Sequence, residues 1–150
     1  MIELNETQKL IMEGKICPYC KRKTEYVDSS VIYGKSHGMI YLCRHCDAYC
    51  GVHKGTDRSL GRLANAELRE LKKEAHEYFD KLWKLKIMGR RKAYAFMSNK
   101  LGIPKKYTHI GMFSKKTCED VVYYSKQFLN DNRRLDLDFG AEPVTSYYEI

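Results

Sequence analysis

The sequence predicts an α+β protein, in which a small three-stranded antiparallel sheet held by cysteines is followed by a three-helix C-terminal part. Two Cys-x2-Cys pairs, Cys17/Cys20 and Cys43/Cys46, enclose a segment whose pattern is typical of a β-hairpin. Beyond residue 65, apolar residues recur at intervals of three and four, which is the period of a helix with one buried face. The two patterns do not overlap, so we expect a sheet region followed by a helical region.

Length and composition limit what the chain can be. With 150 residues it can form one compact domain, or a small module joined to a helical part. The stretch MIELNETQKLIMEGK is charged throughout and lacks the apolar core of a signal peptide, and no segment is long and apolar enough to span a membrane. We therefore expect a cytoplasmic protein without a membrane partner, whose six cysteines stay reduced and favour metal binding over disulfides.

Residues 1–54 are expected to form the N-terminal region, which starts with a short helix. Asn5 followed by Gln8 is typical of a capping box, because each side chain can bond the backbone N–H of the other residue. Gly14 is a plausible end for this helix, since glycine readily adopts the backbone conformation that terminates helices.

The sheet is expected from three short segments. Residues 24–33 and 39–43 flank the glycine-bounded turn GKSHG, which predicts a β-hairpin. Residues 47–53 alternate between apolar and polar side chains and predict a third strand. The inner face of that strand should carry Ala48, Cys50 and Val52.

Residues 55–64 are expected to be a connector, and residues 65–130 a helical region. The first helix should cover about 65–87, because apolar side chains fall on one face and oppositely charged pairs line the other. Asn65 precedes this pattern and is a good N-cap residue.

Two further helices complete the helical region. The segment RRKAYAFMSNKL predicts the second helix, which should end at Gly102 because Pro104 cannot continue it. Ser114 is a good N-cap for the third helix. Residues 131–150 show no sustained period, so we expect a flexible acidic tail.

The cysteine pairs predict a metal site. Each Cys-x2-Cys turn can bring two thiolates to one metal, and the hairpin carries the second pair back beside the first. Four sulfurs in a reducing compartment predict one zinc ion per chain, held by Cys17, Cys20, Cys43 and Cys46. Four sulfurs leave no coordination position for water or substrate, so the zinc of this zinc ribbon should be structural.

Nearby residues leave the ligand set open. Cys50 and His53 follow Cys46 at a metal-like spacing, although Cys50 is more simply a buried apolar residue of the third strand. His45 lies inside the second turn and could replace a cysteine, but side chains at this central position usually point away from the metal. Cys118 falls on the apolar face of the last helix and indicates a core thiol.

The charge distribution indicates a possible binding surface. The net charge is +8, and residues 89–116 contain eight Lys/Arg and no acidic residue. Such a segment can bind phosphate, or it can be a solvated face offset by the acidic tail. Four tyrosines of the ribbon could stack on bases or merely cover it: Tyr26, Tyr33, Tyr41 and Tyr49. The candidate binding residues are Lys21, Arg22, Lys23, Lys35, His37, Arg44, Arg90, Arg91, Lys92, Lys100, Lys105 and Lys106.

Specific segments resemble a known family. The chain carries CPYCKRK at 17–23, DSSVIYG at 28–34, GVHKGTD at 51–57, and LGIP and HIGMF within 101–113. These segments resemble phage and bacterial proteins of a zinc-finger-containing domain family of unknown function, over residues 15–115. The resemblance implies a phage or prophage origin, hence a bacterial host cytoplasm, a structural zinc on the four cysteines, and no catalytic residue. The chain departs from the family at Cys50, where the family has an aliphatic residue, and at Ser59, where it has proline.

No enzymatic signature is present in the sequence. A metal-dependent nuclease would need an ordered set of histidines and acids on a hairpin and a helix, and the available residues do not follow that order: His37, Asp47, His53, His76 and Glu77. No glycine-rich phosphate loop or activated serine motif appears either. We therefore expect a protein that is not an enzyme.

Two functions remain. A basic, tyrosine-rich zinc ribbon followed by a basic helix predicts a binder of nucleic acid or nucleoprotein, without the fixed spacing of a base-reading motif. The alternative is a protein-interaction module that docks on a host protein and inhibits or modulates it, such as a defence or transcription factor that itself binds nucleic acid. The sequence does not predict the oligomeric state.

Overall fold

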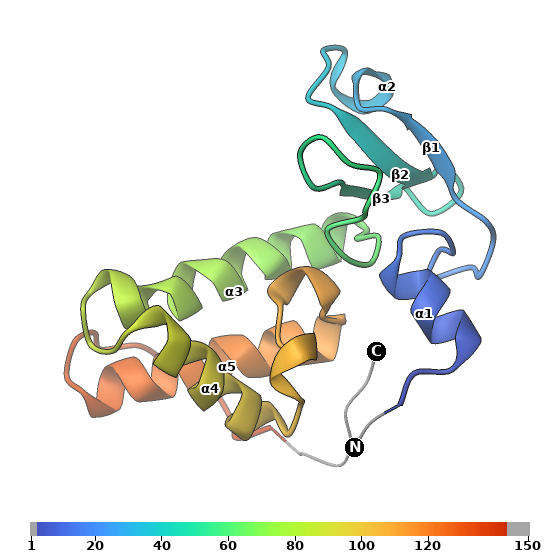
Figure 1. The fold of residues 1–150 in the computed structure, drawn as a ribbon. Helices are drawn as coiled ribbons and strands as arrows, with labels where there is room; N and C mark the ends of the chain where they lie inside the picture. Colours follow the sequence, from blue (N-terminus) through green and yellow to red (C-terminus); the bar gives the residue numbers. More distant parts are fainter. Residues whose placement is uncertain (1–2, 144–150) are drawn as a thin grey trace. The chain divides into compact units, whose positions relative to one another are not determined.

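The chain divides into two units in the computed structural model, which describes residues 3–143. The N-terminal unit is Glu3–Arg69, and the C-terminal unit begins at Glu70. The first unit contains the sheet and the cysteine pairs, and the second contains most of the helices (Figure 1). The α+β class predicted from the sequence is therefore confirmed.

The N-terminal unit opens with helix α1, Glu6–Met12. The predicted capping box is present, because Asn5 accepts a bond from the Gln8 N–H and Gln8 accepts one from the Asn5 N–H. Gly14 follows with a φ of +77°, and a Cβ on it would lie 2.8 Å from the Ser59 Oγ. This position requires glycine for both its left-handed backbone and its close approach to Ser59.

The sheet has three antiparallel strands in the order β1-β2-β3, as predicted. They are β1, Glu25–Asp28; β2, Met39–Cys43; and β3, Ala48–Gly51. Tyr26, Tyr41 and Cys50 lie opposite one another in the three strands and so share one face. That face packs on a buried cluster which includes Cys17, Tyr41, Cys43, Ala48 and Leu63.

The hairpin differs from the sequence prediction, which extended its first strand to Tyr33. Residues Ser30–Tyr33 instead form a short helix, α2, which ends at Gly34 with a φ of +70°. The strand stops because the Asp28 carboxylate accepts bonds from the Ser30 N–H and the Ser36 hydroxyl, both at 2.8 Å. Local side-chain bonds of this kind favour a turn over a continuing strand.

Residues 55–64, predicted as a connector, are part of the N-terminal unit. Ser59 pairs with Val52 and Ala64 pairs with Tyr49, so this segment covers the outer edge of β3. Leu63 is fully buried against the cysteine side of the sheet. The segment thus protects an edge strand that would otherwise expose unpaired backbone groups.

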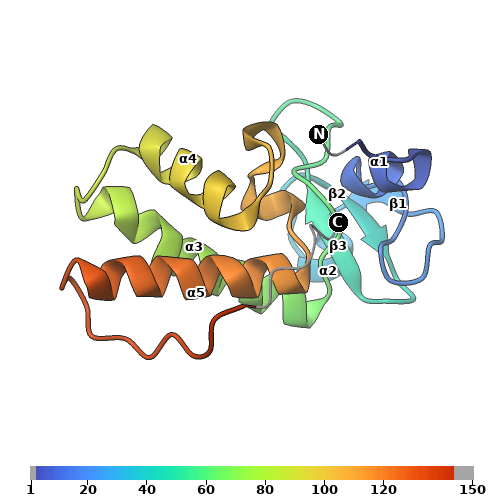
Figure 2. The same ribbon diagram turned by 90° about the horizontal axis from the view of Figure 1, so that it is seen from below.

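Three helices supply the rest of the structure. They are α3, Ala66–Lys84; α4, Arg90–Leu101; and α5, Lys115–Asp131, with two 3-10 turns, Lys105–Tyr107 and Ile110–Met112, between α4 and α5. Asn65 caps α3 by accepting a 3.0 Å bond from the Leu68 N–H, and Gly102 ends α4 with a φ of +68°, as predicted. Figures 1 and 2 both show α3, α4 and α5 side by side.

The core of the C-terminal unit comes from all three helices and the turns. Its fully buried side chains include Phe79, Leu82, Met97, Phe113, Val121 and Leu129. Phe79 also meets the rings of Trp83 and Tyr94 edge-on, with centroids 5.1 Å away in each case. The predicted helical periodicity therefore corresponds to side chains that are buried on all three helices.

The segment after α5 is attached to that helix along part of its length. The Asn130 side chain both donates to the Leu137 carbonyl and accepts from the Leu137 N–H, and Phe139 lies 5.2 Å from Tyr123. The sequence predicted a flexible tail over 131–150, and its part beyond 143 lies outside the described residues. Within residues 3–143, no helix is both long and apolar enough to span a bilayer.

Removal of a buried side chain should test the helical core. Leu82→Ala should lower the free energy of unfolding by about 2–5 kcal/mol, because it removes packed apolar atoms and leaves a cavity. Leu85→Ala is the matched control, since Leu85 is 41% exposed and its loss should cost less than about 0.5 kcal/mol. Urea unfolding followed by the fluorescence of the single tryptophan, Trp83, measures both. Equal stabilities for the two variants would contradict this core.

Candidate metal centre

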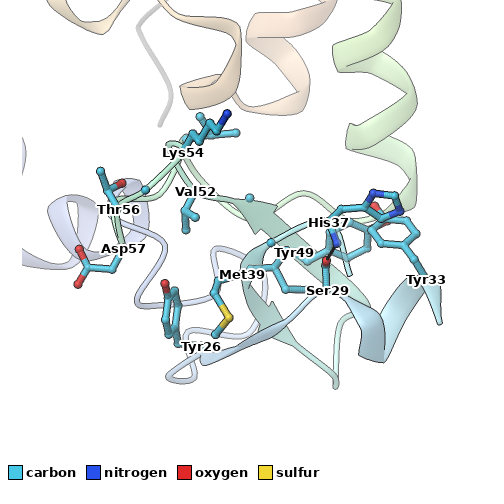
Figure 3. Close-up of a pocket in the computed structure, with 15 residues that line it drawn as sticks. Tyr26, Ser29, Tyr33, His37, Met39, Tyr49, Val52, Lys54, Thr56 and Asp57 are labelled. Atoms are coloured by element: carbon cyan, nitrogen blue, oxygen red, sulfur yellow. Dashed lines mark hydrogen bonds between the residues drawn. The ribbon is translucent and has the colours of Figure 1, made fainter. Parts of the chain in front are cut away.

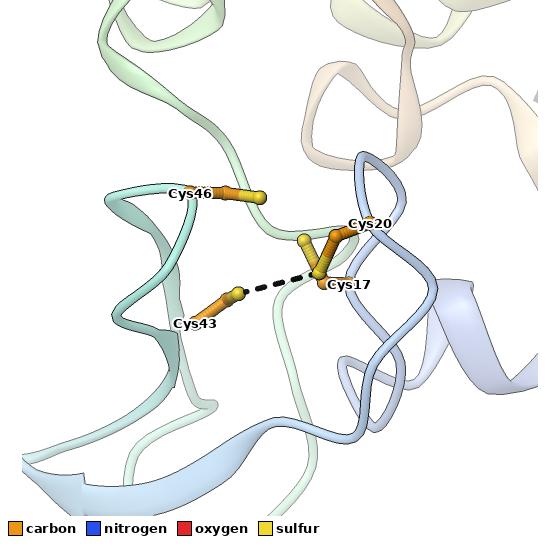
Figure 4. Close-up of side chains that lie close together, drawn as sticks. All are labelled: Cys17, Cys20, Cys43 and Cys46. Atoms are coloured by element: carbon orange, nitrogen blue, oxygen red, sulfur yellow. Dashed lines mark hydrogen bonds between the residues drawn. The ribbon is translucent and has the colours of Figure 1, made fainter.

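The two Cys-x2-Cys turns bring their four sulfurs together. The Sγ atoms of Cys17, Cys20, Cys43 and Cys46 all lie within 4.8 Å of one another, and those of Cys20 and Cys43 are 3.7 Å apart. Figure 4 shows the two pairs pointing toward each other from separate turns. The first turn precedes β1 and the second joins β2 to β3, so pairing of the strands places them face to face.

The two turns share a local geometry. The residue after the second cysteine of each pair, Lys21 or Asp47, has a left-handed backbone with a φ of +63° or +49°. In the first turn the Lys21 N–H donates to the Cys17 carbonyl and the Cys17 N–H donates to the Arg22 carbonyl, both at 2.9 Å. This tight winding lets both sulfurs of a pair point to one centre.

The sulfur positions fit a tetrahedral zinc ion. With Zn–S bonds of about 2.3 Å, the sulfurs of a regular tetrahedron lie about 3.8 Å apart. The Cys20–Cys43 separation of 3.7 Å is close to that value, the other separations are at most 4.8 Å, and Cys17 and Cys43 are buried. Four thiolates complete the coordination shell of zinc and leave no place for a reacting water. The cluster is therefore consistent with one structural zinc.

Electrostatics also favour a cation in this cluster. A hydrogen bond from the Arg22 backbone N–H lowers the pKa of the Cys20 thiol to about 7. Burial, together with the neighbouring sulfurs, raises the pKa of Cys46 to about 12, and burial also raises that of Cys17. Crowded sulfurs cannot all carry negative charge on their own, whereas a divalent cation among them stabilises every thiolate.

The structure places the other sulfur and imidazole groups outside the cluster. Cys50 packs against the buried cluster of the ribbon, and the Ser59 hydroxyl lies 3.5 Å from its sulfur. His45 and His53 are exposed and do not join the four sulfurs, and Cys118 is fully buried in α5. This placement agrees with the interpretation of Cys50 as a packed residue of the third strand that does not bind the metal.

Comparison of the sequence with protein families gives a match that covers most of the chain. Residues 13–128 match a family described as a zinc-finger-containing domain. The chain belongs to this family. The match covers both cysteine turns, the sheet, α3, α4 and most of α5, so the zinc-finger-containing domain includes helices as well as the ribbon. The comparisons with curated proteins and with solved structures found no match.

The basic residues predicted around the cysteine turns differ in what they contact. Lys21 donates to the Pro18 carbonyl of its own turn at 2.6 Å, and Arg44 forms a 2.8 Å ion pair with Glu25. Arg22 and Lys23 are exposed and have no acidic partner among residues 3–143. The freest charges next to the metal turns are thus those of Arg22 and Lys23.

The predicted basic residues of the C-terminal unit gather at two places. Arg90, Arg91 and Lys92 form the first turn of α4, and Lys105 and Lys106 lie in the 3-10 turn that follows Pro104. The Arg90 guanidinium lies 5.6 Å and 5.7 Å from the ring centroids of Trp83 and Tyr94. Lys100 lies near the rings of Phe96 and Tyr124 instead.

The residues considered for a nuclease are not assembled. Asp47 pairs with Arg69, and His76 lies 3.7 Å from Asp80 on α3. Among residues 3–143 the four cysteines are the only cluster of His, Cys, Asp and Glu arranged to hold a metal.

Sequence analysis missed a groove in the N-terminal unit (Figure 3). Its volume is about 1090 Å³, and it lies between the hairpin turn and the 54–60 loop. Candidate residues His37, Tyr26, Tyr33 and Tyr49 line it, together with Lys54 and Leu60, which were not predicted. The segment GVHKGTD contributes to the groove, but its first three residues fall in the predicted third strand and its turn residues indicate a loop only.

Metal analysis tests the centre. Protein purified without added zinc should contain one zinc per chain, and Cys17→Ser should lose both the metal and the cooperative unfolding of the ribbon, because structural zinc contributes about 10 kcal/mol or more. Cys50→Val should keep the metal, since Cys50 packs without binding it. Elemental analysis of the wild type and the two variants measures the zinc content per chain and so tests the ligand assignment. A wild type without zinc, or full zinc content in Cys17→Ser, would refute the ligand assignment.

Proposed function

We propose that the protein is a non-enzymatic nucleic-acid binder whose ribbon is folded by zinc. The main support for this proposal is a set of exposed basic side chains that have no acidic partner among the described residues. They are Arg22, Lys23, Lys35, Arg91, Lys92 and Lys105. Some surface lysines elsewhere are paired, as Lys73 is with Glu70 and Lys84 with Asp80, whereas others, such as Lys9 and Lys86, are exposed without an ion pair among the described residues. Unpaired cations favour a partner that supplies negative charge, such as phosphate.

The start of α4 supports this proposal most directly. A helix N-terminus carries partial positive charge, so acidic residues stabilise it and basic ones destabilise it. The first turn of α4 is nonetheless Arg90, Arg91 and Lys92, without an acidic residue and without a side-chain cap. The backbone N–H groups of a helix N-terminus, with the exposed cations of Arg91 and Lys92 beside them, suit phosphate oxygens.

A protein partner is the second candidate. Large apolar side chains are exposed on the N-terminal unit, among them Val31, Tyr33 and Leu60 at 49%, 52% and 48%. Exposed apolar side chains of this kind favour docking on a protein, and the basic surroundings suit a host protein that itself binds nucleic acid.

Charge reversal at α4 tests the proposal. Arg91→Glu with Lys92→Glu should weaken nucleic-acid binding strongly and lower the slope of log affinity against log salt by about 1.5, because two phosphate contacts are lost. Arg90 is left in place because it packs on Trp83 and Tyr94. Fluorescence anisotropy with labelled DNA and RNA at several salt concentrations measures both quantities.

A control variant distinguishes the loss of a local phosphate contact from the effect of a lower net charge. Lys73→Glu with Lys84→Glu changes the charge equally, but on the outer face of α3, and should affect binding far less. Acidic residues at the start of α4 suit the helix dipole, so the α4 variant should stay folded. Negligible binding by the wild type at low salt would refute the proposal and favour the protein partner.

A further inference from the structure

The groove of the N-terminal unit gives the proposed function a more specific target. We infer that this groove binds unpaired bases of a single-stranded nucleic acid, with Tyr26 and Tyr33 as stacking platforms. The inference rests on the proposed nucleic-acid binding, but it concerns a different surface from the start of α4. Aromatic rings beside cations are the general means by which proteins hold single strands.

Tyr26 offers one ring face to the groove. Its ring lies 5.0 Å from that of Tyr41, at an angle of 47°, so one side is supported by the sheet. The side chain is nevertheless 42% exposed. Tyr41 cannot serve in the same way, because it is buried and its hydroxyl donates to the Asp57 carbonyl. A fixed ring with a free face is suited to stack on a base.

Tyr33 is a second platform, held by two neighbouring rings. Its ring meets those of Tyr49 and His37 at nearly right angles, with centroids 6.0 Å and 5.3 Å away, and its hydroxyl bonds that of Tyr49 at 3.1 Å. The residue is 52% exposed, so a large part of the Tyr33 side chain remains accessible to a ligand. Tyr49 itself is covered by the Arg69 guanidinium at 4.2 Å.

The hairpin turn holds these rings in place before any ligand binds. Ser29 is buried and accepts a 2.6 Å bond from the His37 N–H, while Asp28 bonds Ser36. These bonds tie both sides of the turn that presents Tyr33 and His37. A prearranged site loses less conformational entropy on binding.

Charged residues lie in both of the segments that border the groove. Lys35 lies in the turn between Tyr33 and His37, and Lys54 and Arg58 lie in the opposite loop, where Asp57 is the sole acidic lining residue described. Figure 3 shows Lys54 and Asp57 on one side and Tyr33 and His37 on the other. Cations near exposed aromatic rings match a phosphate backbone whose bases turn toward the protein. A duplex, whose base faces are covered, cannot use these rings.

Paired substitutions separate ring stacking from general apolar contact. Tyr26→Leu with Tyr33→Leu removes the rings but keeps apolar bulk, and should weaken binding to oligothymidine or oligouridine by about tenfold or more. Tyr26→Phe with Tyr33→Phe keeps the rings, removes the same hydroxyls, and should bind nearly as the wild type does. The thymidine and uridine strands show whether DNA or RNA is preferred. Zinc content and thermal melting verify that both variants are folded.

An abasic strand of the same length supplies the decisive comparison. The wild type should bind it about tenfold more weakly than oligothymidine, and the leucine variant should bind the two strands alike. Equal affinity of wild type and leucine variant for oligothymidine would overturn the groove assignment while leaving nucleic-acid binding through α4 intact. Loss of a host-protein complex in the leucine variant, with no nucleic-acid binding by the wild type, would overturn both proposals.

Discussion

Four cysteine sulfurs that must share one small space are the constraint on which the N-terminal unit depends. Residues 3–69 have a three-stranded sheet of short strands, and a sheet of this size has little apolar area to bury. The cluster sits beside Tyr41, Ala48 and Leu63, so metal coordination and the ribbon core are adjacent. A cation there stabilises thiolates that would otherwise repel, and the resulting free energy is folding free energy. The metal site therefore explains how so small a sheet can be stable.

A metal site with four sulfur ligands has no open coordination position, so we expect any binding function to involve the surface of the protein. Because four sulfurs occupy every position on the metal, its role is to fix the two turns and the hairpin that joins them. The turns in this way determine where Arg22, Lys23 and Tyr26 lie. The groove and the basic start of α4 are separate surfaces with similar chemistry, aromatic rings beside cations.

Much of the fold could be predicted because its signals are local. Cysteine spacing gave the metal cluster, and the caps at Asn5, Asn65 and Gly102 marked helix ends through bonds between near neighbours. Predictions were wrong where side chains compete with the backbone or where pairing is distant. Asp28 and Ser29 replaced the end of a strand by α2, and the pairing of Tyr49 with Ala64 places the segment 55–64, predicted as a connector, along the edge of β3. The groove was not predictable, because it joins residues from three segments.

Hydrogen exchange with and without zinc tests the central claim most directly. If the metal holds the N-terminal unit together, its removal by a chelator should abolish amide protection in β2, including Tyr41 and Leu42, which are buried and lie in the central strand. Amides of α5, such as those of Val121 and Ser125, should remain protected, because the described residues of the C-terminal unit include no cluster of metal ligands. Persistent protection of β2 in the metal-free protein would contradict the account.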